Sequence, residues 1–138
     1  MASSPPVYAS RVRLIVVRHA EAAPGEPDHL RPLTDAGRAA ARALGEQLAG
    51  ESIDAIVSSP LVRARETAEA IAQAAGLQIE LDDRLAPGTT VDDIRTAIQG
   101  RGETVVTVGH QPDCSEIVLA LIGREVRFPP GSFHEVQL

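Results

Sequence analysis

Short apolar runs alternate along the chain with longer segments of helical periodicity. The runs are rich in Val, Ile and Leu, which is typical of β-strands, and they cover residues 13–17, 53–57, 77–81, 105–108 and 133–138. Between them, small apolar residues recur at every third or fourth position, as they do in helices that bury one face. The pattern therefore predicts a chain that alternates between strands and helices, with the last run as an edge strand.

Capping residues predict where the helices begin and end. Thr34 is suited to cap a helix that ends at Gly50. A second helix is expected to begin at Ser59 and Pro60, with the serine as its N-cap and the proline as its first residue, and to end at Gly76. Two shorter helices are expected over residues 90–98 and 113–122.

This order of elements predicts an α/β fold. Strands that alternate with helices form a mainly parallel sheet with helices on both faces, which is a three-layer α/β/α sandwich. The chain has 138 residues with neither an internal repeat nor a linker, so we expect one domain over residues 11–138 after a flexible tail at residues 1–10. Such sheets bind ligands outside the carboxyl ends of their strands.

Composition and charge exclude several classes of function. The net charge of −6 argues against nucleic acid as a partner, and 2% aromatic residues are too few for base stacking. No apolar run reaches the roughly 20 residues needed to cross a membrane, and the first ten residues lack the features of a secretion signal. The single Cys114 excludes an internal disulfide and fits a reducing compartment. We therefore expect a cytoplasmic protein with no membrane or nucleic-acid partner.

Charged side chains gather at the predicted carboxyl ends of the strands. Arg18 and His19 follow the first strand, and His110 follows the fourth. Arg63 falls in the first turn of the second helix, near the same edge of the sheet. Arginine offers a fork of donors that matches phosphate oxygens, and a helix N-terminus favours anions. In an acidic protein, this local positive cluster favours a doubly charged phosphoryl group as the ligand.

Four sequence motifs in this order resemble the histidine phosphatase superfamily, whose fold is called phosphoglycerate mutase-like. They are Arg18-His19, Leu33-Thr34-x-x-Gly37, Ser58-Ser59-Pro60-Leu61-x-Arg63-Ala64-x-x-Thr67-Ala68 and Val108-Gly109-His110. The resemblance runs from about residue 13 to the C-terminus. The small size and the run Arg31-Pro32-Leu33-Thr34 look most like the SixA-type phosphohistidine phosphatases. One departure is Ala20, because the family usually has glycine after the first histidine.

The resemblance implies a phosphatase that forms a phosphohistidine intermediate. His19 would attack phosphorus as a neutral imidazole, which the charges of Arg18 and Arg63 would favour by lowering its pKa. We expect a backbone carbonyl in the following loop to bind its other ring nitrogen. Arg18, Arg63 and a protonated His110 would hold the phosphoryl oxygens, with the Gln111 N–H as a further donor. Neither a metal nor a cofactor is expected.

Two further residues are candidates for substrate binding. Glu21 is expected either to orient Arg63 or relay a proton, or else to be an exposed loop carboxylate. Arg31 is expected either to reach the substrate or to have a structural role. The residue types alone do not decide between these alternatives.

The sequence lacks an evident general acid. Relatives often carry an acidic residue after the third strand, where this chain has Ala86 and Pro87, with Asp82 and Asp83 nearby. Solvent readily protonates a phosphoramidate leaving group, whereas an alkyl phosphate depends on general acid catalysis worth about 10²–10⁴-fold. Phosphohistidine on a protein is therefore the favoured substrate. A phosphomonoester of a small metabolite and a phosphate-binding module without turnover are the alternatives.

Overall fold

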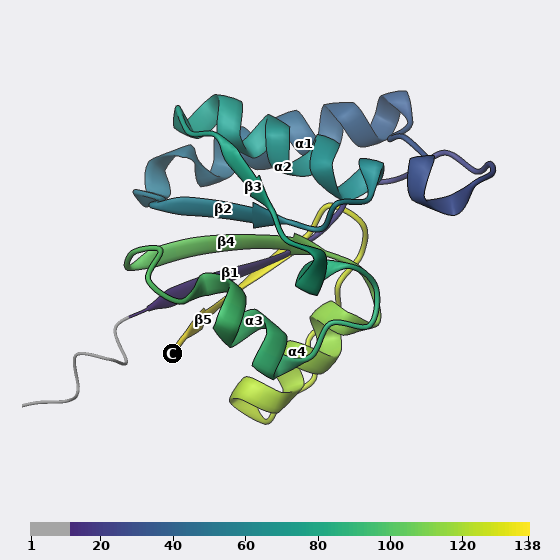
Figure 1. The fold of residues 1–138 in the computed structure, drawn as a ribbon. Helices are drawn as coiled ribbons and strands as arrows, with labels where there is room; N and C mark the ends of the chain where they lie inside the picture. The colour runs from purple at the N-terminus through teal and green to yellow at the C-terminus, as the bar shows by residue number, and fades with distance from the viewer. Residues whose placement is uncertain (1–11) are drawn as a thin grey trace, which may run out of the picture.

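The computed structural model describes residues 12–138, so the predicted tail at residues 1–10 lies outside the described part. Within residues 12–138, the strands form one sheet in the order β3-β2-β4-β1-β5 (Figure 1). Their bounds are β1 (Arg13–Arg18), β2 (Ala55–Ser58), β3 (Ile79–Leu81), β4 (Thr104–Gly109) and β5 (Phe133–Gln137). Neighbouring strands are parallel except for β5, which pairs antiparallel with β1 at one edge. The expected mainly parallel sheet with a final edge strand is confirmed.

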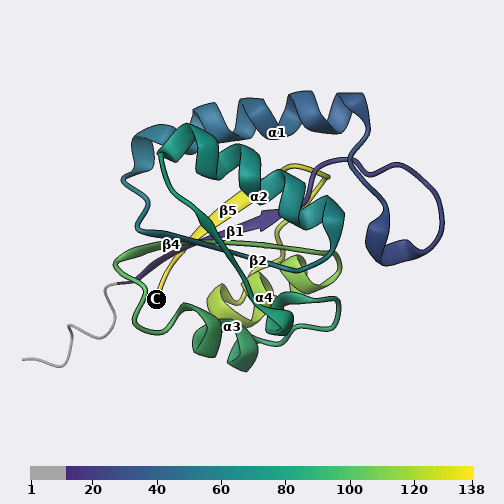
Figure 2. The ribbon, with the colours of Figure 1, turned by 45° about the horizontal axis from the view of Figure 1, so that its top comes forward.

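Helices cover both faces of this sheet, as the predicted sandwich requires (Figures 1 and 2). Alternate residues of β1 show how the layers form. Ile15 and Val17 belong to a core with residues of α1 and α2, whereas Leu14 and Val16 belong to a core with residues of α3 and α4. The helices are α1 (Asp35–Leu48), α2 (Val62–Ala75), α3 (Val91–Ile98) and α4 (Asp113–Ile122).

The second helix begins later than the sequence predicts. Ser59 and Pro60 form a turn in which the Leu61 N–H donates to Ser59 Oγ over 3.2 Å. The helix starts only at Val62, with Leu61 as an N-cap that makes no side-chain hydrogen bond. The prediction of Ser59 as the N-cap is therefore wrong, because this local turn and a contact with His110 engage its hydroxyl.

The loop after β1 packs directly on the start of α1. The Thr34 N–H donates to the Glu21 carbonyl oxygen over 3.0 Å, and Thr34 Oγ1 accepts from the Gly37 N–H as the predicted N-cap. A Cβ atom at Gly37 would lie 2.1 Å from the Glu21 carbonyl oxygen. Glycine is therefore required for this close approach, which holds the backbone that follows His19.

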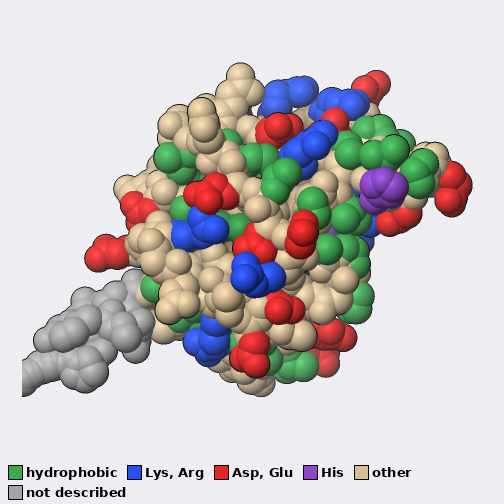
Figure 3. Space-filling view, in the orientation of Figure 1, with side chains coloured by type: hydrophobic (Ala, Val, Ile, Leu, Met, Phe, Trp, Pro, Cys, Tyr) green, Lys and Arg blue, Asp and Glu red, His purple; other side chains and the backbone are tan. Residues whose placement is uncertain are grey.

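The face drawn in Figure 3 carries charged side chains of both signs. Acidic and basic side chains are interspersed there and do not form a continuous stripe of one sign. Among residues 12–138, no helix is both long and apolar enough to cross a bilayer.

Candidate active site

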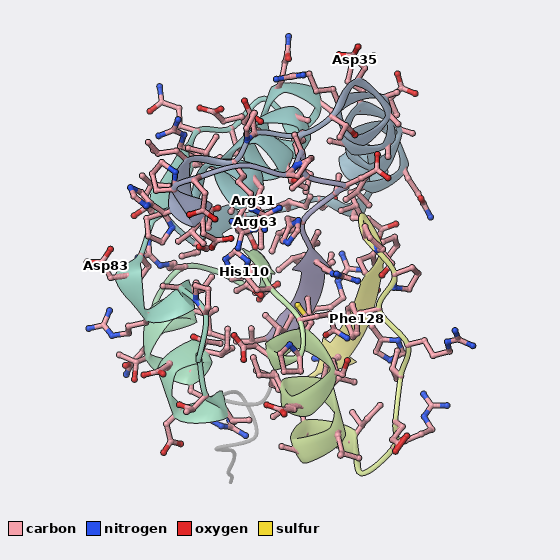
Figure 4. The ribbon with its side chains drawn as sticks, turned by 90° about the vertical axis from the view of Figure 1, so that its right-hand side faces the viewer. Arg31, Asp35, Arg63, Asp83, His110 and Phe128 are labelled. Carbon is pink, nitrogen blue, oxygen red and sulfur yellow. The ribbon has the colours of Figure 1, made fainter. Side chains whose placement is uncertain are left out.

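The carboxyl ends of β1 and β4 border a cavity of about 480 Å³. The register of these strands places Arg18 beside Gly109, so the residues that follow, His19 and His110, emerge next to each other. Figure 4 shows Arg63 and His110 close together at the centre of this side of the molecule. The cavity lining includes every residue that the sequence singles out for catalysis or binding: Arg18, His19, Glu21, Arg31, Arg63, His110 and Gln111.

His19 has the orientation and protonation state of a nucleophile. Its Nδ1 lies 2.7 Å from the Ala20 carbonyl oxygen, which can only accept, so Nδ1 carries the hydrogen and Nε2 keeps its electron pair. This confirms the expected backbone carbonyl partner. Burial lowers the pKa of His19 to about 4, and the charges of Arg63 and Arg18 act in the same direction. The imidazole is therefore neutral at neutral pH, with burial contributing more than the arginines.

Part of each guanidinium group at the cavity is anchored to the protein. Arg18 Nη1 donates to the Phe128 carbonyl oxygen over 2.8 Å. Arg63 Nη1 donates to the Asp28 carbonyl oxygen over 2.9 Å, and its Nη2 donates to the Asp28 carboxylate over 3.2 Å. Only 6% of the Arg63 surface is exposed, so a paired carboxylate is needed to compensate its charge. These contacts fix both arginines at the cavity wall.

His110 faces His19, with the ring centroids 5.2 Å apart and the planes inclined by 58°. Its Nε2 lies 2.8 Å from Ser59 Oγ. Burial lowers the pKa of His110 to about 3, with smaller contributions from His19 and the arginines, and the Asp28 carboxylate opposes this shift without offsetting it. His110 is therefore neutral at neutral pH. The expectation of a protonated His110 concerns the state with a phosphoryl group bound, whereas in the free protein desolvation disfavours the charged ring.

Three buried nitrogen atoms at the cavity have no hydrogen-bond partner among the described residues. They are Arg18 Nε, Arg63 Nε and His110 Nδ1. Unpaired buried polar atoms are rare in folded proteins, and each costs about 1–3 kcal/mol. Their occurrence on three residues that line one cavity indicates a site suited to an anion. The described residues contain no group of three or more His, Cys, Asp or Glu side chains placed to bind a metal ion.

Asp28 supplies the carboxylate that binds both Arg31 and Arg63, a role that the sequence did not predict. It accepts from Arg31 Nε over 3.0 Å as well as from Arg63. Glu21 is exposed and accepts from Thr34 Oγ1 over 2.6 Å, so it does not orient Arg63. The i, i+3 spacing of Asp28 and Arg31 is the only local signal in the sequence, because the contact with Arg63 depends on how the loop folds back.

Among the described residues that follow β3, none places a carboxylate in the cavity where relatives often carry a general acid. Pro87 lines the cavity at this position. Asp82 pairs with Arg84, and Asp83 points away from His110 in Figure 4. Hydrogen bonding to Arg31 makes the largest contribution to lowering the pKa of Asp28, so this cavity carboxylate is ionised and is a poor proton donor.

Ala20 is accommodated where the family usually has glycine. Its N–H donates to Thr67 Oγ1 over 3.0 Å, and its methyl group packs in a small buried cluster with Leu33 and Ala41. Among the described residues other than glycine, only Ser52 has a positive φ, so the backbone at Ala20 needs no glycine. The side chain fills the core beneath α1 and does not line the cavity.

Comparisons with known sequences identify a family and a partial relative. The model of the histidine phosphatase superfamily (branch 1) matches residues 14–87. Phosphoserine phosphatase 1 of Hydrogenobacter thermophilus is 38% identical over 79 residues, which are 54% of this chain and 37% of the relative. The chain therefore spans little more than a third of the length of this curated relative.

Solved structures match over most of both chains. The protein histidine phosphatase SixA, solved in complex with tungstate, has a TM-score of 0.83 and 26% identity, covering 92% of this chain and 88% of that one. A protein assigned as the phosphohistidine phosphatase SixA of Agrobacterium tumefaciens has a TM-score of 0.79 and 28% identity, covering 91% of each chain. The α/β/α fold predicted from the order of elements and the resemblance to the histidine phosphatase superfamily are both confirmed.

Proposed function

We propose, from the premise that the chain belongs to the histidine phosphatase superfamily, that it is a phosphatase whose nucleophile is His19 and whose substrate is phosphohistidine on a protein. The observation that carries the proposal is the hydrogen bond from His19 Nδ1 to the Ala20 carbonyl oxygen. It leaves Nε2 unprotonated in a cavity that also presents Arg18, Arg63 and His110. A neutral imidazole beside clustered phosphate donors is suited to in-line attack on phosphorus.

The reaction proceeds in two displacements. His19 Nε2 forms a bond to phosphorus as the bond from phosphorus to the leaving nitrogen breaks, and that nitrogen keeps the electron pair and takes a proton from water. A water molecule then attacks the phosphorus of phospho-His19. Inorganic phosphate leaves, and the electron pair returns to Nε2. The hydrogen bond to Ala20 keeps the ring in place and helps to disperse the positive charge that the ring gains in the first displacement.

The chain supplies mainly electrostatic stabilisation. Arg18 and Arg63 are held by main-chain carbonyl oxygens, so they enter the reaction already oriented. Their unpaired Nε atoms are donors on residues that line the cavity, and His110 Nδ1 is a third unpaired nitrogen there. Preorganised donors of this kind are typically the largest contribution in phosphoryl transfer, because their orientation costs nothing during the reaction.

Two features support phosphohistidine on a protein as the substrate. No proton donor stands after β3, which a phosphoramidate tolerates better than an alkyl ester does. A groove of about 820 Å³ adjoins the cavity, sharing Arg18 and Gln111 with it, and its wall includes the apolar Leu119, Val126 and Phe128. This groove would hold the segment that carries the phosphohistidine. The likeness to SixA proteins over about nine tenths of the chain agrees with this choice.

Turnover of an aryl phosphate in the presence of a chelator tests the activity independently of the natural substrate. The wild-type protein should release phosphate, and His19→Ala should abolish the release. Folded wild-type protein that binds phosphate without turnover would instead favour a phosphate-binding module. Equal turnover by His19→Ala would exclude His19 as the nucleophile.

A small phosphomonoester is the second candidate, because the Hydrogenobacter thermophilus relative is named a phosphoserine phosphatase. Comparison of kcat/KM for phosphoserine with that for a histidine-phosphorylated carrier protein distinguishes the two substrates. A higher value for phosphoserine would show that the missing acid does not restrict the substrate.

A further inference from the structure

The hydroxyl group of Ser59 has few possible partners. Its side chain is fully buried, and two described groups lie within hydrogen-bond distance of Oγ. One is the Leu61 N–H at 3.2 Å, which can only donate to the oxygen. The other is His110 Nε2 at 2.8 Å, which accepts or donates according to its tautomer. If the Ser59 hydrogen is to be bonded at all, its acceptor among the described residues is His110 Nε2.

The other nitrogen of the same ring gives an independent reason for this assignment. His110 Nδ1 is buried and has no partner among the described residues, and His110 lines the cavity beside Arg18 and Arg63. If Nδ1 carries the ring hydrogen, it is a donor that a phosphoryl oxygen can satisfy. If Nδ1 is bare, an unpaired acceptor is buried beside the binding site of a dianion, which is electrostatically unfavourable.

We propose, on the basis of the phosphatase function proposed above, that Ser59 is a positioning residue, whose hydroxyl donates to His110 Nε2 and thereby keeps the ring hydrogen on Nδ1 for donation to the phosphoryl group. In this arrangement a neutral His110 acts as a hydrogen-bond donor without gaining a proton. Protonation would put a second hydrogen between Nε2 and Ser59 Oγ, so the serine hydroxyl would lose its acceptor.

The charge environment of His110 agrees with a neutral donor. Burial makes the largest contribution to lowering its pKa to about 3, and the nearby His19, Arg63 and Arg18 also disfavour the charged ring. The Asp28 carboxylate raises the pKa of His110, but its contribution is smaller than that of burial. If His110 had to be protonated in order to donate, burial and the neighbouring positive charges would oppose that role. A neutral ring with its hydrogen on Nδ1 can donate without this cost.

Nitrogen-15 NMR of the free protein measures the tautomer directly. The ring signals of His110 are assigned by their loss in His110→Gln. In the wild type, we expect Nδ1 to be protonated and Nε2 to be unprotonated at pH 7. In Ser59→Ala, we expect the hydrogen to be shared between the two nitrogens, and kcat for the aryl phosphate to fall by about tenfold. Because the wild-type spectrum alone reports the tautomer, the test does not depend on the folding of any serine variant.

Ser58→Ala is the matched control. Ser58 is equally buried and adjacent in sequence, but its Oγ donates to the Ser59 carbonyl oxygen and is not hydrogen-bonded to His110. Ser58→Ala should therefore leave the His110 tautomer unchanged. A wild-type His110 protonated on Nε2, or a spectrum of Ser59→Ala identical to the wild type, would overturn the assignment. Either result, together with turnover that depends on His19, would leave the proposed function standing. The expected tautomer without turnover would overturn the function alone.

Discussion

His19 and His110 are both kept neutral by burial, but their free nitrogens serve different purposes. The Ala20 carbonyl oxygen holds the hydrogen of His19 on Nδ1 and leaves Nε2 unprotonated, as the proposed nucleophile requires. His110 has no carbonyl partner; it contacts a serine hydroxyl and leaves Nδ1 unpaired. In the proposed mechanism, these different hydrogen-bond partners give two chemically identical side chains the roles of nucleophile and donor. The residue types predict the carbonyl partner of His19, but they do not predict that burial keeps His110 neutral in the free protein.

The stability of the protein should fall on acidification because both histidines are buried in the neutral form. Unfolding returns their pKa from about 4 and about 3 to the ordinary value of 6.5, so the unfolded chain takes up protons as the pH falls below this value. Each histidine reduces the free energy of unfolding by up to about 1.4 kcal/mol per pH unit between pH 6.5 and its folded pKa. Urea unfolding between pH 7 and pH 4.5 measures this slope.

The variant with His19→Gln and His110→Gln is the control for this prediction. It should lose less stability over the same pH range, because neither glutamine titrates. A wild-type stability that stays constant between pH 7 and pH 5 would contradict the assignment of two neutral buried rings.

Arg63 should matter far more than its neighbour Arg65 in the same helix. Arg63 lines the cavity and carries an unpaired Nε, whereas Arg65 does not line the cavity. Arg63→Ala should lower kcat/KM for an aryl phosphate by on the order of 10²–10³-fold, the usual loss for a preorganised donor to a developing anion. Arg65→Ala should change it by less than about twofold. Equal losses in the two variants would show that general surface charge, and not a specific contact, attracts the substrate.

The backbone at the end of β1 is held in place by segments that are distant in the sequence. The Arg18 N–H donates to the Ser132 carbonyl oxygen, and the Gly131 N–H donates to the carbonyl oxygens of Arg18 and His19. The chain before β5 thus holds the end of β1 from one side, and the start of α1 holds the following loop from the other. The active-site backbone is supported by segments that lie far apart in the sequence.

Gly37→Ala tests the support from α1. Its Cβ would lie 2.1 Å from the Glu21 carbonyl oxygen, so α1 and the loop must separate. We expect a loss of about 1–3 kcal/mol in the free energy of unfolding, with a lower melting temperature in calorimetry. Gly50→Ala is the control, because a Cβ there meets no atom within 4 Å. A Gly37→Ala variant as stable as Gly50→Ala would contradict the close approach.

The sequence predicts local elements well where one periodicity dominates. The apolar run of β1 and the Thr34 cap of α1 appear where expected. The start of α2 does not, because the Ser59 hydroxyl contacts both the Leu61 N–H of a local turn and His110, and the second contact depends on the fold. A serine before a proline is a typical helix cap, but the parallel pairing of β2 with β4 brings His110 within reach of this one. The same limit explains why the role of Asp28 was missed, since its contact with Arg63 spans 35 residues.

The molecule as a whole combines a cavity lined by the candidate catalytic residues with a larger adjoining groove. Alternation along the sequence is enough to predict three layers and the edge at which ligands bind. It does not predict the groove beside α4, because this groove forms between that helix and the segment around Val126 and Phe128. In the proposed function, the cavity residues account for the reaction, whereas the groove bears on the size of the substrate.

Leu119→Glu tests whether the groove binds a protein substrate. Leu119 lies in the groove wall with 43% of its surface exposed. The substitution should lower kcat/KM for a histidine-phosphorylated carrier protein by about tenfold and leave aryl phosphate turnover unchanged. Leu81→Glu is the control, because Leu81 is 50% exposed on β3 and lines neither the groove nor the cavity. Equal effects of Leu119→Glu on both substrates would contradict a docking role.

Identification of the phosphorylated residue during turnover tests the central claim most directly. The wild-type protein is mixed with excess aryl phosphate, quenched in alkali to preserve phosphohistidine, digested and analysed by tandem mass spectrometry. We predict one additional phosphoryl group on His19, formed at least as fast as the steady-state turnover, and none on His19→Ala. A phosphoryl group on another residue, or undiminished turnover by His19→Ala, would contradict the account.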